Sequence, residues 1–416
     1  MFSLNISLNS GNERISEMKS KKFISSILLL TMVSIGVVAC GKNDKPQDKT
    51  GGNGKKNVAF LRIGHVGHDH QLALYLACLE HEKFKKDFGI NLKPVKDREI
   101  YEIIDNGKVA GKIKMVKVGG GAKMTAAMKG GSIDVGFGGV AAVAKFADKG
   151  EPYKIICPLQ TDGDMLVMKK GSPIKTWAEF VKAAKAIKPG QKPLKIGFKA
   201  PAAVAKIVFI NALKHEGITY SEKKGDKVQV YLENQNGGKK MVPALKKGVI
   251  DGFVMNQPAV AKAVNKKFGH VVAELKDLEP KAQNANHPCC CICTTEKQIK
   301  DNGPAIKAFL KIMILSTELI KKDPELAIKA ACKWTNAKSD KVEKESIPTI
   351  TYHGEPTKQW YQGMEHWMTM MKNDGKFAGA KSKFKDMTPK QFVNALCDMS
   401  LCEQAAKELR EKKLIK

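Results

Sequence analysis

Short apolar runs of strand length alternate along the chain with longer segments whose apolar residues recur at helical spacing. Several runs end at glycine or proline, and Asn106-Gly107 is typical of a tight hairpin between two strands. This alternation favours doubly wound α/β sheets. It predicts strands over 58–64, 99–106, 112–118, 153–160, 194–198 and 227–232. It predicts helices over 72–84, 176–187, 204–215, 305–322, 324–335, 359–372 and 389–413.

Two segments of this pattern match each other, and we refer to them as the matched segments. They are residues 120–145 and 237–262, which align without a gap at an offset of 117 residues with 13 of 26 positions identical. Both start with Gly-Gly and a helical stretch and reach Ile-Asp at the start of a short apolar strand. This separation is too long for a solenoid repeat. It predicts two similar α/β lobes whose helix starts face a shared cleft.

The first forty residues have the composition of a secretion signal. Lysines precede an apolar run over 23–38, which is too short for a confident membrane span and ends in small residues before Cys40. This arrangement resembles a bacterial lipobox, which implies cleavage before Cys40 and lipidation of its sulfur. Residues 1–40 are therefore expected to be a lipoprotein signal peptide. Residues 41–57 are almost devoid of apolar side chains and are expected to form a flexible tether.

Charge and cysteine content limit the classes of binding partner and the disulfides that the sequence predicts. The chain has 71 Lys and Arg against 42 Asp and Glu, a formal net charge of +29. Lysine is spread along the whole chain without a basic block or interleaved aromatic residues, so we do not predict nucleic-acid binding. Such a surface attracts anions, although a lysine-rich proteome explains the composition equally well. Of ten cysteines, nine remain after Cys40, and an odd number leaves at least one outside any internal disulfide.

Several motifs in order resemble the type II periplasmic substrate-binding proteins of ABC importers. They are the first strand with the segment 70–77, the segment 129–137, the segment 245–253 with Gln257-Pro258, and His287-Pro-Cys-Cys. The resemblance is to the nitrate/sulfonate/taurine branch, which is grouped with the thiamine-pyrimidine synthases, and runs from about residue 58 to 329. It implies two doubly wound lobes, followed here by a C-terminal helical segment.

The resemblance also implies a domain organisation and a function. We expect residues 58–163 with 280–416 to form lobe 1, and 164–279 to form lobe 2. The expected protein is an extracytoplasmic, lipid-anchored solute-binding protein that captures a small polar or anionic solute and delivers it to an ABC permease and its ATPase. No Ser/His/Asp, P-loop or zincin arrangement is visible, so we do not expect an enzyme. A thiamine-pyrimidine synthase-like protein and a metal or metal-chelate carrier remain alternatives.

The candidate ligand-binding residues lie after predicted strands. Three helix starts there present backbone N–H groups and the positive end of a helix dipole, which favour an anionic or polar group. Ordinary turn glycines are the alternative for each loop taken alone. The candidates are His65, His68, His70, Gly120, Gly121, Gly138, Gly139, Asp162, Ala200, Asn256 and Gln257.

The run Cys289-Cys290-Cys291-Ile292-Cys293 is the sharpest motif. In a regular strand Cys289, Cys291 and Cys293 share one face and form a tentative metal site. The run resembles the cysteine run of the thiamine-pyrimidine synthases, which is associated with iron. Buried structural cysteines are the alternative, so no cofactor is assigned, and iron or another thiophilic metal stays a hypothesis.

Overall fold

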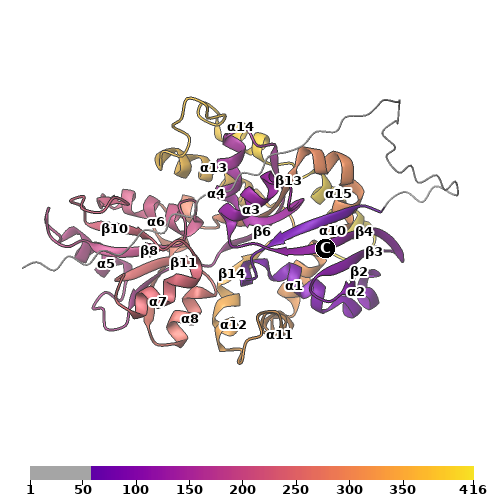
Figure 1. The fold of residues 1–416 in the computed structure, drawn as a ribbon, viewed down its shortest axis with the longest axis horizontal. Coiled ribbons are helices and arrows are strands. Elements are labelled where there is room, and N and C mark those ends of the chain that lie inside the picture. Colours follow the sequence, from indigo (N-terminus) through magenta and orange to yellow (C-terminus); the bar gives the residue numbers. More distant parts are fainter. Residues whose placement is uncertain (1–57) are drawn as a thin grey trace, which may run out of the picture. The chain divides into compact units, whose positions relative to one another are not determined.

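A computed structural model describes residues 58–416, so the expected signal peptide, Cys40 and the tether lie outside the described residues. The described strands form one sheet of eight strands and one of six, with helices packed against both (Figure 1). This architecture confirms the predicted α/β fold class. None of the helices over 58–416 is long and apolar enough to cross a membrane.

The first sheet has the order β14-β6-β13-β5-β1-β4-β3-β2. At its centre β1 pairs in parallel with both β4 and β5, whereas β13 and β6 are antiparallel to their neighbours. The hairpin predicted at Asn106-Gly107 joins β3 to β4, and both turn residues have positive φ. The strands are β1 (Phe60–His65), β2 (Ile90–Lys96), β3 (Ile100–Asp105), β4 (Lys108–Lys117), β5 (Val135–Gly139), β6 (Tyr153–Asp162), β13 (Pro288–Thr295) and β14 (Ile350–Tyr352).

The second sheet has the order β12-β7-β11-β8-β10-β9. Its central strand β8 pairs in parallel with β10 and β11, as β1 does with β4 and β5. A separate cluster of buried apolar residues packs on this sheet and includes Phe253 and Val260. The strands are β7 (Asp164–Lys169), β8 (Leu194–Phe198), β9 (Tyr220–Ser221), β10 (Val230–Asn234), β11 (Gly252–Asn256) and β12 (Gly269–Glu274).

Most predicted helices are present, but two are each divided. The stretch 72–84 forms α1 and the start of α2, which meet at Glu80. The stretch 389–413 is interrupted because Cys397 forms a bridge with Ile155 and the Asp398 amide donates to the Ile155 carbonyl. The helices are α1 (Leu72–Leu79), α2 (His81–Phe88), α3 (Gly121–Lys129), α4 (Val140–Asp148), α5 (Trp177–Lys185), α6 (Val204–His215), α7 (Met241–Lys246), α8 (Ala259–Asn265), α9 (Lys281–Asn284), α10 (Glu296–Lys322), α11 (Pro324–Thr335), α12 (Lys341–Ser346), α13 (Lys358–Asn373), α14 (Pro389–Leu396) and α15 (Ser400–Glu411).

The matched segments occupy equivalent places in the two different sheets. The first runs through α3 and β5 beside β1, and the second runs through α7 and β11 beside β8. In each, the aspartate of Ile-Asp pairs with the central strand. The Asp134 amide donates to the Arg62 carbonyl and its carboxylate accepts from the Arg62 amide at 2.8 Å. Asp251 makes the same two bonds with Lys195, the second at 3.0 Å.

Each central strand carries a glycine beneath the helix of its matched segment. A Cβ atom at Gly64 would lie 2.5 Å from the Met124 sulfur, and one at Gly197 would lie 3.1 Å from the Met241 sulfur. Both distances are below ordinary van der Waals contact, so each helix approaches its sheet only because the strand has a glycine there. The sequence match is therefore a repeated packing unit, with the same glycine-methionine contact in both sheets.

The chain passes between the sheets twice. Strand β6 of the first sheet continues through Gly163 directly into β7 of the second sheet. Gly163 has a φ of +76°, which glycine adopts without strain. The return passage runs from the end of β12 through α9 to β13.

Candidate functional site

A cavity of about 1280 Å³ lies where the central strands of both sheets end. Its walls come from the loops that follow β1, β4 and β5 in the first sheet and β8, β10 and β11 in the second. Since these strands run parallel within each sheet, their carboxyl ends meet at one edge, where ligands bind in open α/β sheets. We call this cavity the cleft.

Gln71 holds the loop after β1 in place. Its Oε1 accepts from the amide of Val66 and from the hydroxyl of Tyr75, both at 2.8 Å. Its Nε2 donates to the Phe137 carbonyl at 2.7 Å, which joins the loop to β5. The Tyr75 hydroxyl also accepts from the Gly67 amide at 2.7 Å. The side chain of a buried glutamine therefore fixes the backbone that lines this wall of the cleft.

Three helices of eight or more residues begin at the cleft. Gly120 precedes α3, Gly139 precedes α4, and Ala203 precedes α6, and all three line the cleft. None of these first residues has a side chain that caps its helix. The N-termini therefore direct backbone donors and positive dipole ends toward this space.

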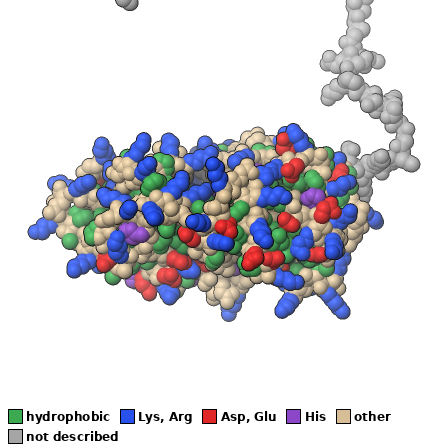
Figure 2. Space-filling model, turned by 90° about the horizontal axis from the view of Figure 1, so that it is seen from below, with side chains coloured by type: hydrophobic (Ala, Val, Ile, Leu, Met, Phe, Trp, Pro, Cys, Tyr) green, Lys and Arg blue, Asp and Glu red, His purple; other side chains and the backbone are tan. Residues whose placement is uncertain are grey.

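Lysine dominates the charged side chains that line the cleft, and Figure 2 shows Lys and Arg spread over one face of the molecule. Among the residues over 58–416 that line the cleft, Asp164 alone has a carboxylate. None of the lining lysines pairs with a carboxylate within 4.0 Å among the described residues, whereas Lys83 and Lys321 elsewhere do. We call the following residues the cleft lysines: Lys117, Lys123, Lys199, Lys239, Lys240, Lys246, Lys262 and Lys266.

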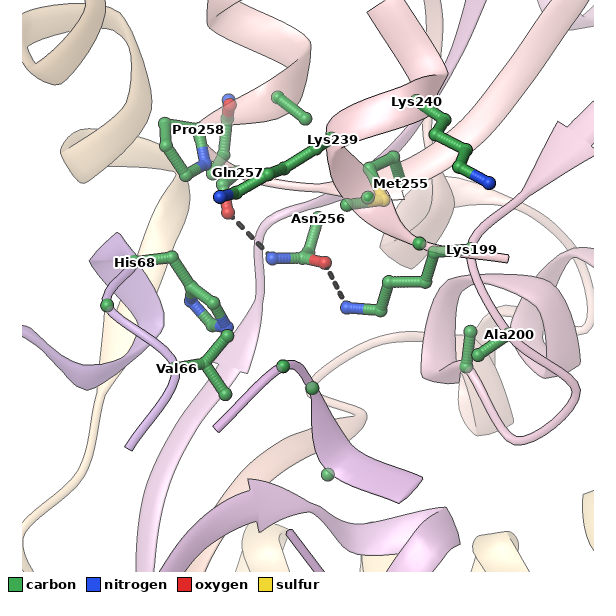
Figure 3. Close-up of a pocket in the computed structure, with 18 of the residues that line it drawn as sticks. Val66, His68, Lys199, Ala200, Lys239, Lys240, Met255, Asn256, Gln257 and Pro258 are labelled. Atoms are coloured by element: carbon green, nitrogen blue, oxygen red, sulfur yellow. Dashed lines mark hydrogen bonds between the residues drawn. The ribbon is translucent and has the colours of Figure 1, made fainter. Parts of the chain in front are cut away.

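The second-sheet wall carries a connected set of polar side chains (Figure 3). The Lys199 ammonium donates to Oδ1 of Asn256, and the Asn256 side-chain amide donates to the Gln257 carbonyl at 2.7 Å. The Gln257 Oε1 accepts from the Ala261 amide at 3.0 Å, so this side chain tethers the first turn of α8. Figure 3 shows His68 on the opposite wall, across the cleft from Asn256.

Two of the three histidines predicted near the first loop, His68 and His65, differ in position. His68 lines the cleft, and burial together with the charges of Lys199, His65 and Lys262 lowers its pKa to about 3. His65 lies behind the wall with its Nδ1 3.2 Å from the Tyr75 hydroxyl, and burial lowers its pKa to about 4. Both rings are neutral at pH 7, so they offer hydrogen bonds rather than charge.

His287 joins the two passages between the sheets. It precedes β13 on the return passage, and its Nε2 lies 3.1 Å from a carboxylate oxygen of Asp164 at the start of β7. Burial lowers the pKa of His287, but the hydrogen bond to Asp164 and the charges of Asp164 and Asp162 outweigh it and raise the pKa overall. The stability that this pairing contributes is therefore complete below the unfolded pKa and is lost as pH rises through the folded one.

The cysteines of β13 do not follow the alternation expected of a regular strand. The register of β13 against β6 shifts between Cys290 and Cys291, which marks an irregularity in the strand. The sulfurs of Cys289 and Cys290 lie 3.9 Å apart, and both are within 4 Å of Nδ1 of His70, at 3.5 and 3.8 Å.

The thiols of Cys291 and Cys293 in this strand do not contact His70 but backbone carbonyls of β5. Cys291 donates to the Gly138 carbonyl at 3.6 Å and Cys293 to the Gly136 carbonyl at 3.4 Å. The tentative trio of Cys289, Cys291 and Cys293 is therefore not one ligand set. Ligand atoms of His70, Cys289 and Cys290 instead lie within 4.8 Å of one another.

The structure places only part of the predicted ligand-binding set at the cleft. His65, His70 and Asp162 are buried outside the lining, and Gly121 is the first residue of α3. The lining also contains Gln71, Asp164, Cys290 and the eight cleft lysines, which sequence reasoning missed. The predicted residues that line the cleft are His68, Gly120, Gly138, Gly139, Ala200, Asn256, Gln257 and Cys289.

The chain has two sheets joined by two passages, with a cleft at the strand ends. This arrangement defines the periplasmic binding protein fold, and solved structures of such proteins align with it. A nitrate-binding protein from Synechocystis PCC 6803 aligns with a TM-score of 0.63 at 14% identity, over 86% of this chain and 91% of its own. The ligand-binding component of an ABC-type import system from Staphylococcus aureus, solved with zinc bound, gives 0.61 at 14% identity, over 83% and 99%. The aliphatic sulphonate-binding protein from Escherichia coli gives 0.55 at 17% identity, over 81% and 99%.

Sequence comparison shows the family. Residues 82–336 match the NMT1-like family, and the chain belongs to it. An uncharacterized protein from Methanocaldococcus jannaschii is 35% identical over 151 residues, which is 36% of this chain and 97% of that protein. The resemblance to periplasmic substrate-binding proteins is thereby confirmed in family and fold.

Proposed function

We propose that the protein is the extracytoplasmic solute-binding component of an ABC importer and captures a small anionic or polar solute in the cleft. The observation that carries this proposal is the position of the cleft at the carboxyl ends of two equivalent sets of parallel strands. Helix N-termini there, and lysines that have no carboxylate partner among the described residues, favour negative charge. The named binding proteins of nitrate and sulphonate share the fold.

The proposal includes the division into lobes and their closure. Residues 58–163 with 280–416 form lobe 1 and residues 164–279 form lobe 2, and the passages at Gly163 and before β13 act as the hinge. A lipid on Cys40 holds the mature protein at the membrane, where the closed form meets a permease and its ATPase. No catalytic step is part of this function.

Native mass spectrometry of protein purified from its own host, without refolding, tests the proposal. We expect one small solute per chain, released when the protein is denatured. Recombinant protein with that solute removed should rebind it at one per chain. Covalent turnover of the solute into a different product, or a protein that never carries or binds a solute in a broad screen, contradicts the proposal.

A second candidate, a carrier of a thiophilic metal, rests on the cluster of His70, Cys289 and Cys290. Two thiols and one imidazole suit a soft or borderline metal. Burial raises the pKa of Cys289 well above its usual range, so a metal must displace the thiol proton on binding. Anaerobic purification followed by metal analysis should find about one metal per chain, lost in Cys289→Ser. Metal-free protein with fully reactive thiols excludes this candidate.

A further inference from the structure

The cleft lysines leave far more positive charge than one singly charged solute can neutralise. The lining has eight lysines and one carboxylate, whereas the whole chain has 71 basic and 42 acidic residues. Asp164, the one carboxylate, already pairs with His287. The overall lysine richness of the chain therefore does not account for the lining, because its distinguishing feature is the scarcity of acidic residues.

These charges lie on both walls of the cleft. Lys117 ends β4 and Lys123 lies in α3, on the side of the first sheet. The other six belong to elements of the second sheet, and Figure 3 shows Lys199, Lys239 and Lys240 among them. Because the two groups come from different sheets, a single small anion contacts only some of them, whereas a ligand with separated negative groups reaches both walls.

Lysines of both sheets line the same cavity, so their charges face one another across it. Charges of one sign that face each other across a cavity repel, which destabilises the empty protein. A ligand of opposite charge relieves this repulsion and gains from every lysine within a screening length.

The cleft also has room and apolar surface for an organic body. Its volume of about 1280 Å³ exceeds the roughly 300–1,000 Å³ usual for pockets that hold drug-sized ligands. Phe137, Val204, Met255 and Phe268 line it between the charged groups. An ion as small as nitrate leaves most of this surface without contacts.

Resting on the proposed function, we infer that the solute is an organic anion with at least two separated negative groups, either phosphates or carboxylates. Pyrophosphate, tripolyphosphate and citrate serve as probes of this charge class, with nitrate and methanesulfonate as singly charged comparisons. Calorimetric titration at one fixed, low ionic strength should show binding that tightens about tenfold for each added ligand charge. Comparing citrate with pyrophosphate, which carry similar charge near neutral pH, distinguishes carboxylate from phosphate chemistry.

A pair of charge variants separates cleft lysines from charge in general. Lys239→Gln with Lys266→Gln removes two cleft charges, and Lys85→Gln with Lys223→Gln removes two exposed charges outside the lining. We expect the cleft pair to weaken pyrophosphate binding at least tenfold and the control pair less than twofold. Thermal unfolding without ligand should show that the cleft pair is folded, with a midpoint equal to or above that of the unaltered protein.

The outcomes separate the charge class from the function itself. If nitrate, methanesulfonate or a neutral solute binds one per chain and as tightly as the multivalent probes, or if both variant pairs lose the same affinity, the charge class is overturned while the proposed function stands. If none of the multivalent probes binds more tightly than the singly charged ones, the charge class is likewise overturned. If no probe and no solute from a broad screen binds, the proposed function fails as well.

Discussion

Asp134 and Asp251 hold equivalent places in the two sheets but have different surroundings, which predicts unequal costs of truncation. The side chain of Asp134 is buried and accepts from the amide, Nε and Nη2 of Arg62 at 2.8, 2.8 and 2.7 Å, and from Gln298 at 2.9 Å. Asp251 accepts from the Lys195 amide at 3.0 Å and from Lys169 at 3.2 Å, and its side chain is more exposed.

The expected loss in the free energy of unfolding depends on which polar groups each truncation leaves without a hydrogen-bond partner. Asp134→Ala removes four hydrogen bonds, most of them charge-assisted, but the Arg62 side chain is 38% exposed, so its guanidinium regains water. We expect a loss of about 3 kcal/mol in the free energy of unfolding. Asp251→Ala removes two bonds, one to an exposed lysine, and should cost about 1 kcal/mol. For a folded part of this size these losses lower Tm by about 4 °C and about 1 °C.

Thermal and urea unfolding followed by circular dichroism measure both losses at pH 7.5. Asp87→Ala is the matched control, because Asp87 forms an exposed pair with Lys83 one turn away and should leave the unfolding midpoint nearly unchanged. If Asp134→Ala costs no more than Asp87→Ala, or less than Asp251→Ala, the repeated aspartate contact does not stabilise the first sheet as the structure indicates.

Three further outcomes are expected. Gln71→Leu keeps the side-chain volume but leaves the amides of the loop after β1 without their acceptor, so urea unfolding should show a loss of about 2 kcal/mol, and an unchanged midpoint contradicts the role of Gln71. The lowered pKa values of His65 and His68, about 4 and about 3, keep both neutral in the folded state, and His353, whose pKa is also lowered to about 4, behaves in the same way. The stability that these three histidines contribute is complete above about pH 6.5 and is lost on acidification. The raised pKa of His287 acts in the opposite direction but concerns one group, so Tm should be lower at pH 5.0 than at pH 7.5, and the reverse order refutes this. The buried sulfurs of Cys157 and Cys402 lie 3.6 Å apart, so refolding with glutathione disulfide should join them in a cross-linked peptide, whereas alkylation of both after such refolding speaks against a disulfide.

Local sequence patterns predicted those features that depend on short-range chemistry. The predicted Asn106-Gly107 hairpin appears in the structure, and the helix predicted from residue 176 is present, with Thr176 and Glu179 forming a capping box at its start. The matched segments predicted two equivalent units because the Ile-Asp contact and the helix packing involve only neighbouring strands. The packing partners Gly64 and Gly197 lie outside these segments and were not recognised, since a single strand glycine carries no signal of what approaches it.

Features that depend on contacts between distant segments were not predictable in the same way. Strand periodicity placed Cys289 and Cys291 on one face, but an irregularity in pairing with β6 brings Cys290 beside Cys289 instead. The predicted helix over 389–413 divides because Cys397 pairs with Ile155 on β6. The cleft lysines are scattered through the sequence, and only the fold shows that they line one space. A recognisable signal existed for Gln71, a polar residue at the start of an apolar helix.

Closure of the cleft on its solute is the central claim, and small-angle X-ray scattering tests it most directly. The mature protein is measured without solute and then with a saturating amount of the solute that it retains from its host, with the Asp87→Ala variant as a control for handling. We predict that the radius of gyration decreases on binding and recovers when the solute is removed. Stoichiometric binding with an unchanged radius of gyration contradicts the account.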